Sequence, residues 1–181
     1  MVGKKCDVQY NKFICDFYRE LNKKNTKYSN LIFLCIGTDR IIGDCFGPIV
    51  GGKLQKNIHQ LKLPSNIYGT LDNPISALNL KETTNKIKIE YKDPYIIAID
   101  AALSTEDNVG KIFICDNYLE AGKGIKEKGI RVGNISIRAI IGKKENTSRK
   151  NMDILQNTSL NMVIKLAEIV SNGIIEVIQN I

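Results

Sequence analysis

The chain has 181 residues, and its hydrophobic and charged fractions, 43% and 25%, are those of an ordinary globular domain with a buried core. No apolar run approaches the roughly 20 residues that cross a bilayer, and the N-terminal residues lack the apolar segment of a secretory signal, so we expect a cytoplasmic protein without a membrane partner. The net charge of +7 could attract nucleic acid, but the lysines are scattered and no nucleic-acid-binding motif accompanies them. Nucleic acid is therefore not an expected partner.

The first predicted elements are a helix and a strand. Apolar side chains recur at helical spacing over residues 7–23, which predicts an amphipathic N-terminal helix. A polar connector follows, and Leu31–Ile36 is then a continuous apolar run. A run without polar alternation is typical of a strand that is covered on both faces, as in a parallel sheet.

A polar loop and a second helix follow this strand. The apolar run breaks at Gly37 into a loop that carries Asp39 and Arg40. Asp44 is a favourable N-cap residue, and we place a helix at 44–60 behind it. Strand, glycine-containing loop and helix in this order put acidic side chains at the carboxyl end of a strand, where open α/β sheets bind their ligands.

The rest of the chain alternates between strands and helices. In order, the predicted elements are a short strand at 67–71, a helix at 75–90 behind Asp72-Asn73-Pro74, an apolar strand at Tyr95–Ala101, a strand at 111–115, an irregular glycine- and lysine-rich loop at 120–133, a strand at 135–141 and one long helix at 152–179. This order predicts a three-layer α/β/α sandwich of the phosphorylase/hydrolase-like kind, with a mainly parallel central sheet.

The predicted sheet has 31–36, 95–100 and 111–115 as its central strands. We expect the whole chain, 1–181, to form a single domain. In that domain 31–141 is the core, the N-terminal helix and its connector occupy 1–30, and the C-terminal helix completes the fold.

Two of the predicted apolar strands lead into aspartates, Asp44 after the first and Asp100 at the end of the strand at 95–101. If these strands are neighbours, the two carboxyl groups meet in one crevice and share a proton. One can then activate water while the other donates a proton, as amide hydrolysis requires. Because a helix N-terminus favours a charged Asp44, Asp100 is expected to hold the proton. The plainer alternative is that Asp44 is only a helix cap and Asp100 only a strand-end residue.

The loop after the first strand offers weaker candidates. Residues 37–40 precede a helix and could hold a phosphate, but they match no nucleotide-binding loop. Arg40 could form an ion pair with Asp39 that shapes the loop, which we favour, or orient a substrate carboxylate. Cys45 has no histidine near it in the sequence to act as a base and adjoins a carboxylate, so we interpret it as structural.

Metal ligands are scarce in this sequence. The five cysteines form no CxxC pair, and the single histidine, His59, lies about four turns along the predicted helix from Asp44. The aspartates Asp39, Asp44 and Asp100 offer only oxygen ligands. We therefore expect neither a tightly bound transition metal nor a cofactor.

Four segments resemble one known family. GTDRIIGDCFGPIVG, GTLDNPISALNL, YIIAIDA and VGNISI, spaced between about Leu31 and Ile141, resemble the sporulation protein YyaC family of endospore-forming bacteria. That family is in turn similar to the germination (spore) protease and, more distantly, to the hydrogenase-maturation endopeptidases, which share an α/β/α fold. The resemblance implies a catalytic aspartate pair at Asp44, in DCFGP, and Asp100, in IIAIDA, and a glycine loop at Gly122–Ile125.

Together, the residues and the resemblance predict a sporulation-associated peptidase of the germination-protease type in the forespore or spore interior. Its substrate would be a peptide or protein, such as a spore protein. The residues predicted to bind that substrate are Thr38, Asp39, Arg40, Gly122 and Gly124. Two alternatives stay open: a non-catalytic sporulation protein that binds a peptide or partner in the same crevice, and a metal-dependent maturation endopeptidase. Assembly into a homo-oligomer also stays open.

Overall fold

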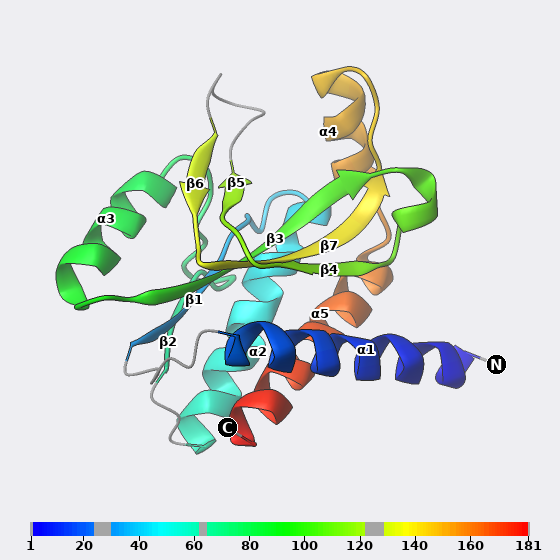
Figure 1. Ribbon diagram of the computed structural model, residues 1–181. Coiled ribbons are helices and arrows are strands. Elements are labelled where there is room, and N and C mark those ends of the chain that lie inside the picture. The colour runs from blue at the N-terminus through cyan, green and yellow to red at the C-terminus, as the bar shows by residue number, and fades with distance from the viewer. Residues whose placement is uncertain (1, 24–29, 62–64, 122–128, 181) are drawn as a thin grey trace.

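In the residues described by the computed structural model, 2–23, 30–61, 65–121 and 129–180, the strands of the central sheet follow the order β2-β1-β3-β7-β4 (Figure 1). Their bounds are Leu31–Cys35 for β1, Ser65–Tyr68 for β2, Tyr95–Ser104 for β3, Ile112–Cys115 for β4 and Ile135–Lys143 for β7. The strands β2, β1, β3 and β7 are parallel, and β4 runs antiparallel to β7. The prediction of a mainly parallel sheet is confirmed.

Strand β4 is an edge strand, so its predicted central place is wrong. Strand β7 lies between β3 and β4 in the sheet. The connection from β3 to β4 holds only a 3-10 turn at Glu106–Asn108 and its flanking residues. A parallel crossover needs a dozen or more residues, so the chain can only turn back in the antiparallel direction. Strand β4 then pairs with β7 and not with β3, so the edge of β3 is occupied by β7.

Helices and a small hairpin cover the two faces of the sheet. Helices α1, α2 and α5 lie on one face, and α3 lies on the other with the hairpin β5–β6 (Figure 1). Their bounds are Val2–Asn22 for α1, Phe46–Leu61 for α2, Leu80–Glu90 for α3, Leu160–Gln179 for α5, Leu119–Ala121 for β5 and Ile130–Val132 for β6. The three-layer α/β/α architecture is therefore confirmed. None of the described helices combines the length and apolar character that crossing a membrane requires.

The C-terminal region forms two helices, where one was predicted. Helix α4 spans Ser148–Asn157, and α5 begins at Leu160. Between them the Thr158 hydroxyl donates to the Ile141 carbonyl (2.8 Å), and the Ser159 hydroxyl caps α5 by accepting from the Met162 N–H (3.3 Å). The apolar pattern continues across this break. The pattern alone therefore did not indicate that Ser159, in the middle of the segment, is an N-cap residue.

Helix α3 starts five residues later than predicted, at Leu80. Ile75, expected in its first turn, instead forms a parallel bridge with Ile36, and its carbonyl accepts from the Gly37 N–H (2.8 Å). The preceding strand also ends earlier than predicted, because Gly69 adopts a positive φ of 92° directly after β2. The segment between β2 and α3 is thus an extended loop that supports the turn after β1.

The segment 120–133, predicted to be irregular, contains most of the β5–β6 hairpin. Leu119, Ala121 and Val132 are buried in the smaller core on the α3 face of the sheet. The connection between the two strands, 122–128, lies outside the described residues. Three-residue strands carry too little alternation to be recognised in a segment rich in glycine and lysine.

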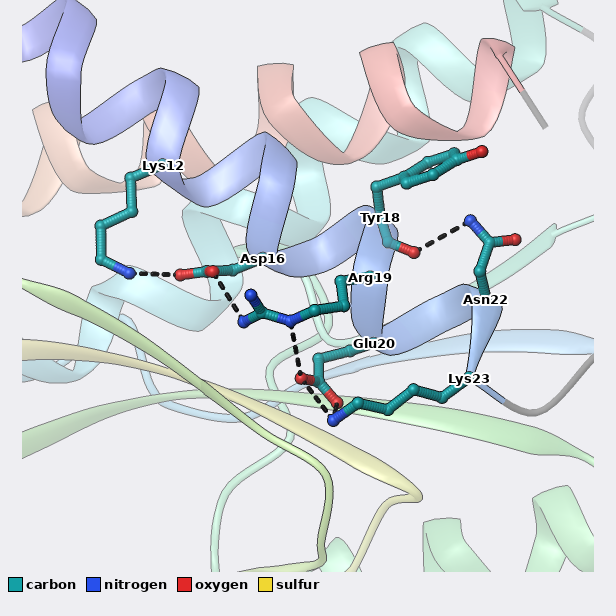
Figure 2. Close-up of polar contacts among 7 residues, drawn as sticks. All are labelled: Lys12, Asp16, Tyr18, Arg19, Glu20, Asn22 and Lys23. Atoms are coloured by element: carbon teal, nitrogen blue, oxygen red, sulfur yellow. Dashed lines mark hydrogen bonds and ion pairs between the residues drawn. The ribbon is translucent and has the colours of Figure 1, made fainter.

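Helix α1 carries a chain of ion pairs along one side (Figure 2). Asp16 is paired with Lys12 and Arg19, and Glu20 with Arg19 (3.7 Å) and Lys23 (2.6 Å). Pairs among exposed side chains stabilise a helix only slightly. Glu20 differs because it is buried, and its two cationic neighbours supply the charge that a buried carboxylate requires.

Candidate active site

The candidate site lies where the chain paths after β1 and β3 separate. After β1 the chain continues to β2, which lies on one side of β1 in the sheet. After β3 it continues to β4 and β7, which lie on the opposite side of β3. Such a switch point leaves space at the carboxyl ends of the strands. The pairing of β1 with β3 ends at Cys35 and Ile99, and β3 continues to Ser104 with β7 as its partner. Asp100 is the first residue of this extension.

Asp44 reaches the same place from the loop after β1. It lies inside a 3-10 turn, Gly43–Cys45, that runs directly into α2. The predicted N-cap role is therefore wrong, because the 3-10 turn starts the helical segment before Asp44. The Asp44 backbone carbonyl accepts from the Thr38 N–H (3.1 Å), which ties the turn to the loop. A side chain at Gly37 would collide with this carbonyl, 2.0 Å from an ideal Cβ position.

The two predicted catalytic carboxyl groups are electrostatically coupled. Burial raises the pKa of Asp100 well above its usual range, and the negative charge of Asp44 raises it further. The Ala101 N–H, which donates to this carboxylate, and the positive charge of Arg138 lower the same pKa. The residue keeps partial solvent access although its carboxyl group lies deep among protein atoms. Burial also raises the pKa of the half-buried Asp44.

This coupling has a direct chemical consequence. Of the two carboxyl groups, Asp100 has its proton affinity raised by two causes and Asp44 by burial alone. The first proton taken up by the pair is therefore held mainly on Asp100. A protonated acid beside a carboxylate is the arrangement that general acid and base catalysis needs.

The sequence comparisons identify the family. The family described as "Protein of unknown function (DUF1256)" matches residues 4–173. The chain belongs to the DUF1256 family. It is 37% identical over 145 residues to the "Uncharacterized protein YyaC" of Bacillus subtilis (strain 168), an alignment that covers 80% of this chain and 67% of that protein. The resemblance to YyaC inferred from the four segments is confirmed.

A solved structure was also matched. It is the crystal structure of a NiFe hydrogenase maturation protease, HycI, from Thermococcus kodakarensis KOD1. The TM-score is 0.48 at 16% sequence identity, and the match covers 86% of this chain and 96% of that chain.

Sequence reasoning missed one charged residue of the site in this DUF1256 protein. Arg138 lies opposite Asp100 in the β3–β7 register, and its guanidinium donates to the Cys115 Sγ (3.1 Å). Its side chain is exposed, so the cation is accessible beside the carboxyl pair. An arginine in the alternating strand at 135–141 was visible in the sequence. Its opposition to Asp100 depends on a pairing between strands far apart in the chain, which no local pattern encodes.

The predicted substrate-binding residues fall into two groups. Thr38 accepts from the Arg40 N–H (3.3 Å) and donates to Asp39 (3.4 Å), and the side chains of Asp39 and Arg40 are exposed. Within the described residues no ion pair joins Asp39 to Arg40, so the favoured structural role of that pair is not seen. Gly122 and Gly124 lie outside the described residues.

The thiol beside the site is poorly suited to be a nucleophile. Burial and the negative charges of Asp39 and Asp44 raise the pKa of Cys45. The thiol donates to the Ile41 carbonyl (3.4 Å). A thiol is reactive in its ionised form, which these surroundings disfavour. The structural interpretation of Cys45 therefore agrees with its surroundings.

In the described portions of the chain, no cluster of three or more His, Cys, Asp or Glu side chains has an arrangement suited to a metal ion. The side chain of His59 lies outside this description.

Proposed function

We propose that this DUF1256 protein is a peptidase of the germination-protease type that acts in sporulation and hydrolyses peptide bonds with Asp44 and Asp100. One observation carries the proposal: the carboxyl groups of Asp44, in the 3-10 turn after β1, and of Asp100, on β3, are coupled at a switch point, so that one holds a proton beside the other. The DCFGP and IIAIDA segments, which resemble those of the germination protease, support the same two residues. A spore protein inside the forespore or spore is the proposed substrate.

The proposed reaction needs one water molecule and the two carboxyl groups. Asp44, as carboxylate, takes a proton from water while the oxygen attacks the peptide carbonyl carbon, and Asp100 gives its proton to the carbonyl oxygen. This step forms a tetrahedral intermediate with two hydroxyl groups. The proton on Asp44 then passes to the nitrogen, the carbon–nitrogen bond breaks, and a hydroxyl proton returns to Asp100. An acid and an amine are released, and the pair regains its starting state.

Arg138 acts as a positioning residue in this scheme. Its positive charge opposes the rise in the pKa of Asp100, so it limits how tightly that carboxyl group holds its proton. A donor that holds its proton too strongly transfers it slowly, because general acid catalysis is most effective when the pKa lies near the working pH.

The test is peptide cleavage by the parent protein and by Asp44→Asn and Asp100→Asn, with spore-protein-derived peptides as substrates. Each variant is expected to lower kcat roughly 10²–10⁴-fold, the usual contribution of a general acid or base. Asp107→Asn is the matched control, since Asp107 is an exposed aspartate in the 3-10 turn after β3. Unchanged cleavage by both variants would refute the aspartate mechanism. No cleavage by the parent across a broad peptide library would favour a protein that only binds peptides.

A further inference from the structure

Asp100, Arg138 and Phe113 form a row across three neighbouring strands. Arg138 lies opposite Asp100 in the β3–β7 register, and Phe113 lies opposite Arg138 in the β4–β7 register. Strands β3, β7 and β4 lie side by side in the sheet (Figure 1). Because neighbouring strands are about 4.8 Å apart, the backbone of Arg138 is one strand spacing from that of Asp100, and the backbone of Phe113 is two spacings away.

This row is accessible on the side of the sheet that carries the smaller core. On each strand the two residues that flank the row residue belong to the larger core or pack against it. Successive side chains of a strand point to opposite faces, so the three residues of the row lie on the other face. Arg138 is exposed, Phe113 is 37% exposed, and Asp100 keeps partial solvent access. A substrate can therefore reach the row from solvent.

The guanidinium of Arg138 has donors left for a ligand. One of its N–H groups donates to the Cys115 Sγ (3.1 Å). Among the described residues no carboxylate forms an ion pair with Arg138. A guanidinium carries several N–H groups, and pairs of them match the two oxygens of a carboxylate. A cation that is accessible beside the proposed proton donor is complementary to a substrate with a carboxylate at this place.

The spacing of the row favours the C-terminal carboxylate of a peptide. The carbon of that carboxylate lies about 3–4 Å from the carbonyl carbon of the last peptide bond, whatever the sequence of the peptide. If this last carbonyl is at Asp100, the carboxylate lies toward Arg138 and the last side chain toward Phe113. An acidic side chain is joined to the backbone through flexible CH₂ groups, so holding it at Arg138 would cost more conformational entropy.

The charges around the row are compatible with a bound carboxylate. Asp44 lies after β1, and β3 separates β1 from the strand that carries Arg138, so the substrate anion is kept away from the Asp44 charge. The positive charge of Arg138 lowers the pKa of Asp100, and a carboxylate bound to Arg138 offsets this effect. Substrate binding thereby favours the protonated form of Asp100, which the proposed reaction requires.

We propose that Arg138 binds the free C-terminal carboxylate of the peptide substrate and that Phe113 contacts the last side chain, so that the protein acts as a carboxypeptidase. The assignment rests on the proposed peptidase function. One water molecule hydrolyses the last peptide bond through the same proton transfers at Asp44 and Asp100, and a single amino acid leaves. An apolar last residue is preferred, because the ring of Phe113 offers it an apolar surface.

The first experiment measures binding to the full chain carrying Asp100→Asn, which slows turnover. The probe is a fluorescein-labelled tetrapeptide of three alanines and a final leucine, made as the free acid or as the C-terminal amide, and followed by fluorescence anisotropy. The free acid should bind about fivefold to tenfold more tightly, the upper range for an accessible ion pair with paired donors. Arg138→Gln should abolish this preference. Arg138→Lys should keep part of it, because lysine retains the charge without the paired donors.

Arg149→Gln is the matched control, because Arg149 is an exposed arginine in the first turn of α4, outside the row. Equal losses in Arg138→Gln and Arg149→Gln would indicate general attraction by the net charge of +7 and overturn the proposal. Equal binding of the acid and the amide before any change at Arg138 would overturn it as well. A third probe is the amide with glutamate as its third residue. If this probe binds as tightly as the free acid, Arg138 binds acidic side chains, and the C-terminal assignment is wrong.

The contact with Phe113 is tested with free-acid probes that end in leucine or in glycine. The leucine probe should bind about threefold to tenfold more tightly, since part of its side chain is buried against the ring. Phe113→Ala should remove most of this difference. Tyr18→Ala, at an aromatic residue of α1 that is 49% exposed, should leave it unchanged. A leucine preference that survives Phe113→Ala would refute this contact.

Product analysis separates this proposal from the peptidase proposal. If the parent is a carboxypeptidase, mass spectrometry should detect release of one amino acid from the free-acid peptide and much slower cleavage of the amide. Cleavage at internal bonds, equal in the acid and the amide, would refute the role of Arg138 and leave the peptidase standing. A binding preference that depends on Arg138, without cleavage of any peptide by the parent, would refute the peptidase function and leave Arg138 as a carboxylate-binding residue.

Discussion

Asp100 makes the stability of the protein depend on pH in an unusual direction. In the unfolded chain its pKa is near the ordinary value of about 3.9, and in the folded protein it is well above that value. Between the two values the folded state binds more protons than the unfolded state. The contribution of Asp100 to the free energy of unfolding is therefore greatest below the unfolded pKa and falls as pH rises through the window.

The Asp100→Asn variant should lose this dependence. Asparagine still accepts from the Ala101 N–H but carries no charge into the buried site. The variant should become more stable than the parent with rising pH, by about 1.4 kcal/mol per pH unit inside the window. Urea unfolding at a series of pH values measures this, with the exposed Asp107→Asn as control. A difference that stays constant with pH would remove the basis for a shared proton.

The charge of Asp44 accounts for part of the raised pKa of Asp100. Asp44→Asn should therefore lower the pKa of Asp100 while leaving it above the ordinary value, since burial is the larger cause. A carbon NMR titration of the Asp100 carboxyl group measures the change. Asp39→Asn is the control, because the charge of Asp39 acts on Cys45 and is not among the causes at Asp100. An Asp100 titration that moves equally in both variants would contradict a specific pair.

At this scale the sequence was informative about which aspartates come together and less so about their surroundings. Asp44 and Asp100 could be selected because apolar strands bring them to one edge of a parallel sheet. The N-cap role predicted for Asp44 is wrong because the helical segment already begins at Gly43, as a 3-10 turn. Arg138 could not be found, since its approach to Asp100 is a matter of register between β3 and β7.

Among the elements, α2 depends on small residues for its close approach to the sheet. An ideal Cβ on Gly51 would lie 1.9 Å from the Gly69 carbonyl oxygen, while one on Gly52 would meet nothing within 4 Å. Gly51→Ala should therefore destabilise the protein by roughly 1–3 kcal/mol or more, because the backbone itself must move. Gly52→Ala should stabilise it by about 0.5–1 kcal/mol, since alanine is the better helix former.

Thermal unfolding of the two variants measures this contrast between neighbouring residues of one helix. Gly51→Ala should also disturb the end of β2, because the added methyl group would meet the backbone carbonyl of Gly69, directly after that strand. Similar melting temperatures for the two variants would show that α2 packs less closely than described.

Element types were easiest to predict where burial is continuous. The predicted strands at 31–36 and 95–101 begin as continuous apolar runs, and both appear inside the sheet, as β1 and β3. The errors fall where one pattern covers two structures. The helical spacing of apolar residues over 152–179 continues through the break between α4 and α5. Pro74 is a plausible first residue of a helix, but it lies in the loop between β2 and α3.

The whole molecule consists of two hydrophobic cores that share one sheet. The larger core lies under α1, α2 and α5, and the smaller one under α3 and the hairpin. Within β3 the side chains alternate between them, so that Ile97 belongs to the larger core and Ile96 to the smaller. A strand that serves both cores cannot leave one without disrupting the other.

The single domain expected from the sequence stays a prediction, and this shared strand provides its test. Ile97→Val and Ile96→Val remove one methylene from opposite faces of β3, and each should cost about 0.5–1.5 kcal/mol. If the chain unfolds as one unit, each variant should lower the protection of the slowest-exchanging amides in α3 and in α5 by the same free energy. Native-state hydrogen exchange by NMR measures both helices at once. Ile89→Val, at a position 87% exposed on α3, should change neither. Loss of protection in α3 alone after Ile96→Val would show that the smaller core opens independently, and the chain would then consist of two cooperative units.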